Sequence, residues 1–100
     1  MIAVKISKEN NKYKKLNILG HAMYDDYGKD IVCSAVSSIV TTTVNGILML
    51  DKDSLSYLAS KKGMIIDIKN TYNTTQILID NMVNLLKDLE KKYPENISFK

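Results

Sequence analysis

The only histidine and the only cysteine of the chain lie twelve positions apart, and together they could perform nucleophilic chemistry. They are His21 and Cys33, within the segment GHAMYDDYGKDIVCSAVS. A thiol has an ordinary pKa of about 8.5, and the thiolate is the form that attacks a carbonyl carbon. A nearby imidazolium favours the thiolate, and a helix N-terminus also favours it while offering backbone N–H groups to an oxyanion. The spacing therefore permits a Cys33–His21 dyad for acyl transfer.

Simpler interpretations stand beside the dyad. A lone cysteine on a helix is usually a small buried hydrophobic residue, and a lone histidine after a strand is usually a surface or cap residue. One histidine, one cysteine and scattered aspartates lack the clustered spacing of a zinc site, so no metal is expected. Two neighbouring kinds of side chain also have two interpretations: Tyr24 and Tyr27 are substrate contacts or local packing, and Ser37 is a partner of the thiolate or a packing residue. The simplest interpretation of Asp25, Asp26 and Asp30 is loop solvation plus a helix cap.

A strand pair and a helix would have to position the two residues. Residues 2–7 alternate apolar and polar side chains, which predicts a strand, and residues 13–20 predict a second strand after a turn centred on Asn10 and Asn11. His21 then follows the end of that second strand.

The segment 31–50 predicts a buried helix that begins beside the loop. Its apolar residues recur at spacings of three and four, and Asp30 is a good N-cap type. Cys33 would then lie in the first helical turn. The face expected to be apolar consists of Val32, Val36, Ile39, Thr43, Ile47 and Leu50, with Cys33, Ser37, Val40 and Val44 in a neighbouring stripe.

The rest of the chain predicts a second hairpin, a second helix and a last strand. Residues 54–60 and 64–70 flank the turn Lys61-Lys62-Gly63. Asn73 and Gln76 resemble a capping box at the start of a helix that Pro94 ends, and residues 96–100 suit a short strand. The apolar face of that helix is expected to be Leu78, Met82, Leu85, Leu86, Leu89 and Tyr93. The order ββαββαβ predicts an α+β fold, with a mixed or antiparallel sheet packed with two helices, as a single domain over residues 1–100.

Composition narrows the class of protein. The chain has 100 residues, of which 45% are hydrophobic, enough for one small core. One cysteine forms no internal disulfide, and the first ten residues lack the apolar run of a signal peptide, so a cytoplasmic location is expected. All fourteen basic residues are lysines, so bidentate recognition of phosphate or guanine is excluded and no direct nucleic-acid readout is expected. Residues 31–50 carry no charge, but seven of them are Ser, Thr or Asn, which favours a core helix over a membrane span.

The segment from Gly20 to Ser37 resembles the ribosomal-processing cysteine protease family, called Prp. The resemblance is carried by GHA, by the loop that contains aspartates and a glycine, and by DIVCSAVS. It implies Cys33 as the nucleophile and His21 as the general base. It further implies supporting residues: Asp30 orients the histidine or caps the helix, Ser37 supports the site from the helix face, and Gly20 leaves room beside the histidine. It also implies that substrate orders a loop over residues 22–32. The residues expected to contact the substrate are Tyr24, Asp25, Asp26, Tyr27 and Gly28.

The same resemblance implies the partners. The substrate would be the N-terminal extension of large-subunit ribosomal protein twenty-seven, cut at a phenylalanine-rich site, and the enzyme would be a homodimer that needs no cofactor. Two alternatives remain from the residues alone. One is a non-catalytic ribosome-associated binding module, and the other is a thiol-dependent hydrolase or transferase that acts on a small molecule.

Overall fold

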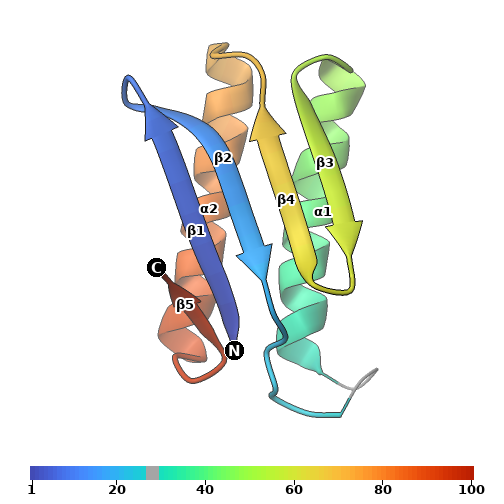
Figure 1. Cartoon of the computed structure of the whole chain (residues 1–100), viewed down its shortest axis with the longest axis vertical. Coiled ribbons are helices and arrows are strands. Elements are labelled where there is room, and N and C mark those ends of the chain that lie inside the picture. The colour runs from blue at the N-terminus through green and yellow to red at the C-terminus, as the bar shows by residue number, and fades with distance from the viewer. Residues whose placement is uncertain (27–29) are drawn as a thin grey trace.

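A computed structural model describes residues 1–26 and 30–100. A five-stranded sheet has the strand order β3-β4-β2-β1-β5, and helices α1 and α2 both cover one of its faces (Figure 1). Strand β5 is parallel to β1, and the other neighbours are antiparallel. The predicted α+β class and element order are confirmed. In chain order the elements are β1 (Ile2–Glu9), β2 (Lys12–Leu19), α1 (Ile31–Leu50), β3 (Leu55–Ser60), β4 (Gly63–Ile68), α2 (Asn73–Lys92) and β5 (Ile97–Phe99).

The β1–β2 hairpin closes at the predicted turn. Asn10 and Asn11 both have positive φ angles, 52° and 63°, which match the right-handed twist of the strands they join. The pairing register shifts between Ser7 and Lys8, so a bulge interrupts strict alternation. As a result Tyr13 is buried on the same side as the even-numbered Leu16 further along β2.

Helix α1 begins as predicted. The Asp30 side chain accepts hydrogen bonds from the N–H groups of Val32 and Cys33, which makes it the N-cap. One side of the helix is buried, through Val32, Val36, Val40, Val44 and Ile47, whereas the predicted core residue Leu50 is 69% exposed. By length and composition alone α1 could cross a membrane, but core helices pass the same test.

The predicted capping box of α2 is wrong. The N-cap is Tyr72, which forms no side-chain cap bond. Gln76 instead reaches across to β2, where its carbonyl accepts from the Tyr13 N–H at 2.7 Å and its amide donates to the Tyr13 carbonyl at 3.0 Å. The last β2–β4 pair is Lys15 with Asp67, so Tyr13 lies beyond the point where β4 pairs with β2. The glutamine therefore supplies the hydrogen-bond partners of the Tyr13 N–H and carbonyl.

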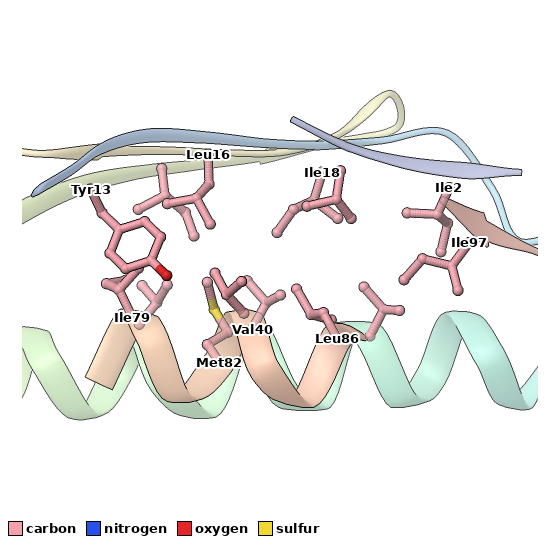
Figure 2. Packing of buried hydrophobic residues seen from close by; sticks show 14 of the residues in the cluster. Ile2, Tyr13, Leu16, Ile18, Val40, Ile79, Met82, Leu86 and Ile97 are labelled. Carbon is pink, nitrogen blue, oxygen red and sulfur yellow. The ribbon is translucent and has the colours of Figure 1, made fainter. Parts of the chain in front are cut away.

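The core lies between the sheet and the two helices (Figure 2). In Figure 2, Ile18 points toward the helix layer that carries Leu86, and Ile97 of β5 lies beside Ile2. Leu85, expected in the apolar face of α2, is 42% exposed, because the helix turns Met82 and Leu86 to the sheet instead. This packing fixes the end of β2 and the start of α1, the two places where the candidate dyad lies.

Candidate active site

A cleft of about 800 Å³ opens where β2 ends and α1 begins. Residues 20–26, which follow β2, run below the lower end of the sheet in Figure 1. His21 and Cys33 both line this cleft, as do Asp25 and Asp30 of the joining segment. The fold thus brings the two candidate catalytic residues to one cavity.

Cys33 lies in the first turn of α1 and is partly buried. Its sulfur accepts a hydrogen bond from the backbone N–H of Ala22 at 3.3 Å. The segment that carries His21 therefore contacts the nucleophile through its backbone.

Asp30 occupies the helix start that was expected to hold an oxyanion. One carboxylate oxygen accepts from the N–H groups of Val32 and Cys33 at 3.0 and 2.9 Å. The other accepts from Tyr24 at 2.9 Å and from Asp25 at 3.3 Å. The expectation that these helix amides form the oxyanion site is therefore wrong for Val32 and Cys33, whose N–H groups already have an anionic partner.

The same four bonds decide the charge state of Asp30. Burial alone would raise the pKa of this carboxyl, but the backbone N–H groups of Cys33, Tyr24, Asp25 and Val32 together hold the pKa below its ordinary value. The carboxylate is thus a fixed negative charge that joins the loop to the helix. Between the two roles that the resemblance implies for Asp30, the hydrogen bonds in this structure are those of a helix cap.

His21 is exposed at the edge of the cleft, directly after Gly20. Gly20 has a φ of +96°, and an added Cβ would lie 2.5 Å from the carbonyl oxygen of Met1. The Gly20 N–H donates to the Lys62 carbonyl at 2.9 Å, which ties this point to the β3–β4 turn. Within the described residues, no hydrogen bond joins the imidazole to the Cys33 sulfur.

Two residues near the C-terminus, neither of them predicted to belong to the site, hold the segment that follows His21. The Asn96 side chain donates to the Ala22 carbonyl at 2.9 Å. The Tyr93 ring packs edge-on against the ring of Tyr24, with centroids 5.4 Å apart. Both contacts join segments about seventy positions apart, so no local sequence pattern reports them.

Some of the other residues predicted for the site line the cleft, and others do not. Ser37 lines the cleft one turn after Cys33, and Asp25 lines it from the loop. Tyr24 and Asp26 are not among the described residues that line it, and the Asp26 N–H donates to the Asp25 carboxylate at 2.7 Å. Tyr27 and Gly28 lie outside the described residues. The opposite wall of the cleft, which no local sequence pattern predicted, includes Tyr57, Ala59, Ser60, Lys61 and Met64.

The chemistry available in this cleft is that of a thiol and an imidazole that line the same space. Across residues 1–26 and 30–100, no group of three or more His, Cys, Asp or Glu side chains could hold a metal ion. A thiol at a helix start, with a backbone donor on its sulfur and a histidine at the same cavity, suits nucleophilic attack on a carbonyl.

Residues 1–98 match the sequence profile of the family described as cysteine protease Prp. The chain is 31% identical over 101 residues to the ribosomal processing cysteine protease Prp of Staphylococcus aureus, covering 97% of this chain and 95% of that protein. It is 23% identical over 108 residues to the Bacillus subtilis protein of the same name, covering 97% and 94%. A crystal structure of the essential S. aureus protease with a covalently linked product peptide matches with a TM-score of 0.91 at 29% identity, over 100% of this chain and 98% of that one.

The chain belongs to the cysteine protease Prp family. It is therefore an enzyme of the ribosomal processing type, and the alternative of a non-catalytic binding module is set aside.

Proposed function

We propose that the chain removes the N-terminal extension of large-subunit ribosomal protein twenty-seven during ribosome assembly, through a Cys33–His21 dyad. The observation that carries the proposal is the shared cleft, in which Cys33 begins α1 and His21 follows β2. The similar S. aureus protease has been crystallised with a substrate peptide as well as with a covalently linked product. A covalent enzyme–product bond is what a nucleophilic mechanism leaves.

The reaction proceeds in two steps. The Cys33 thiolate attacks the scissile carbonyl, an S–C bond forms, and the tetrahedral intermediate collapses with loss of the C–N bond. The His21 imidazolium gives its proton to the leaving amine. His21 then takes a proton from water as the water attacks the thioester; the C–S bond breaks, the carboxylic acid leaves, and the Cys33 thiolate and His21 imidazolium are restored. His21 and Cys33 share the cleft in the free enzyme, and bound substrate tightens their contact, since catalytic hydrogen bonds are often long in an empty site.

Asp30 and Ser37 support the site, and the loop receives the substrate. Asp30 acts as a positioning residue, because its carboxylate joins Tyr24 and Asp25 to the start of α1. Ser37 presents a hydroxyl to the same cleft one turn along the helix. The loop over 22–32 receives the substrate, and Asp25 of this loop lines the cleft. The cleft includes apolar Ile18, Val36 and Met64, which suit the phenylalanine side chains expected around the cut.

The enzyme acts in the cytoplasm as a homodimer. A domain of 100 residues buries only about 60–65% of its unfolded surface, so a partner subunit adds stability. Large apolar side chains remain exposed in this fold, including Met49 at 88% and Leu50 at 69%. Light scattering at several protein concentrations would measure the mass, and a monomer at micromolar concentration would contradict the dimer.

Alkylation tests the dyad independently of any substrate. Iodoacetamide should modify Cys33 rapidly at pH 6.5, because in the proposed pair the His21 imidazole takes the proton of the thiol. The His21→Ala variant should react at least tenfold more slowly at that pH and approach the wild-type rate at pH 9.5. Equal rates for both proteins at pH 6.5 would contradict the proposed pair.

A further inference from the structure

Strand β3 forms one edge of the sheet and also one wall of the catalytic cleft. It has six residues, and in the strand order only β4 is its neighbour. Tyr57 and Ala59, two positions apart on this strand, both line the cleft that contains Cys33. The edge and the nucleophile therefore border the same space.

The pairing register shows which backbone groups of β3 face outward. The Gly20 N–H donates to the Lys62 carbonyl, so these two residues form a hydrogen-bonded pair. Such pairs alternate along an antiparallel ladder, and the β2–β4 register therefore directs the backbone groups of the even-numbered β4 residues to β2. The odd-numbered residues of β4 must then bond β3, where the register gives them even-numbered partners. The N–H and C=O groups of Tyr57 and Ala59 are consequently directed away from β4, to the edge.

The two edges of the sheet differ. Strand β5 at the other edge has only three residues, and its Phe99 N–H donates to the Glu90 carboxylate at 2.9 Å. Within the described residues, no hydrogen bond reaches the outward N–H groups of Tyr57 and Ala59. An open edge of this length is a template for another strand, and proteins normally protect such edges unless they use them.

The dimensions suit a peptide. Cys33, Ser37 and Thr41 recur every fourth residue along α1 and form the wall opposite β3. The eight steps from Cys33 to Thr41 span about 12 Å at 1.5 Å per residue. An extended chain covers that length with three to four residues at about 3.3 Å each. A strand laid on the β3 edge would direct alternate side chains into the cleft.

We propose that the substrate binds by adding an extended strand to the β3 edge, with its backbone bonded to Tyr57 and Ala59 and its scissile bond delivered to Cys33. The inference rests on the proposed peptidase function and names the element that positions the peptide. Main-chain bonds supply affinity in this mode, while the cleft selects the alternate side chains. The occupant is an extended peptide segment with apolar side chains at every second position.

Ester substitution in a synthetic peptide substrate tests the proposal on the unaltered enzyme. Each amide near the cut is replaced in turn by an ester, which removes one N–H donor and adds no bulk. The value of kcat/KM should fall about three- to tenfold at two positions that are two residues apart, and change little at the residue between them. Equal losses at adjacent positions would overturn the strand arrangement. If the unsubstituted peptide is not cleaved at all, the proposed function fails instead.

The Ala59→Pro variant tests the enzyme side. Proline removes an outward N–H but no β3–β4 bond, and Ala59→Val adds comparable bulk while keeping the N–H. The proline variant should cleave at least tenfold more slowly than the valine variant, with iodoacetamide alkylation of Cys33 at the wild-type rate in both. Equal cleavage by the two variants would overturn the proposal. An Ala59→Pro protein that cleaves normally but changes from dimer to monomer would also overturn the proposal, since it would show that the β3 edge binds a second copy of the chain.

Discussion

The side chain of Asn96 donates a 2.9 Å hydrogen bond to the carbonyl of Ala22, although the two residues are 74 positions apart. The N–H of Ala22 in turn contacts the Cys33 sulfur at 3.3 Å. Asn96 belongs to the turn between α2 and β5, where its own carbonyl accepts from the Ile2 N–H at 2.9 Å. A residue at the far end of the chain thus holds the backbone that carries His21 against the start of α1.

Asn96→Ala should impair the site more than the fold. Loss of the hydrogen bond should lower the free energy of unfolding by about 1 kcal/mol. With its carbonyl released, Ala22 should no longer hold its N–H at the Cys33 sulfur. We expect kcat to fall about three- to tenfold and Cys33 alkylation at pH 6.5 to slow. Asn96→Asp should show the same defect, because a carboxylate cannot donate. Asn84→Ala, at an exposed position of α2, is the control. An unchanged alkylation profile in Asn96→Ala would leave Asn96 with a structural role only.

Gly20→Ala and Gly46→Ala should have opposite effects. At Gly20 the positive φ and the Met1 carbonyl both oppose a Cβ, so the free energy of unfolding should fall by about 1–3 kcal/mol. At Gly46, in the middle of α1, nothing lies within 4 Å of the added Cβ, so alanine should stabilise by about 0.5–1 kcal/mol. Urea unfolding measures both. A Gly20→Ala protein as stable as wild type would show that the turn before His21 relaxes freely.

Asp30 should make stability depend on pH at the acid end. The folded pKa lies below the ordinary 3.8, so the contribution of the carboxylate is fully present above that pH and is lost as pH falls through the folded pKa. Asp30→Asn should therefore be less stable than wild type by about 1.5–3 kcal/mol at pH 7, with the gap closing below pH 3.8. Asp88→Asn, on the exposed side of α2, is the control and should show no such gap. A gap that is constant with pH would contradict the role of the charge.

Gln76→Ala should destabilise the fold far more than Asn73→Ala. Removal of the Gln76 amide leaves the Tyr13 N–H and carbonyl without their partners, at a cost of roughly 2–3 kcal/mol in the free energy of unfolding. Asn73 makes no cap bond, so its alanine variant should stay within about 0.5 kcal/mol of wild type. A true capping box would instead make Asn73→Ala cost about 1 kcal/mol. Chemical denaturation of the two variants separates these possibilities.

Local patterns predicted the elements well because their causes are local. Period-two alternation located β1 and β2, and the residue type of Asp30 located the start of α1 within one position. The pair that shares the cleft was also predictable, since both of its members adjoin those elements. Local patterns did not predict contacts between distant segments, such as that of Gln76 with Tyr13, which are separated by 63 positions. The opposite wall of the cleft on β3 was missed for the same reason.

Cleavage of the extended ribosomal protein precursor, followed by intact-protein mass spectrometry, tests the central claim most directly. Wild-type protein should convert the precursor to a single pair of fragments whose masses add up to that of the precursor plus one water. Cys33→Ala should leave the precursor intact while it keeps a cooperative unfolding transition, because only one sulfur at a helix start is lost. Cleavage by Cys33→Ala at the wild-type rate would contradict Cys33 as the nucleophile, and an intact precursor with both proteins would contradict the proposed substrate.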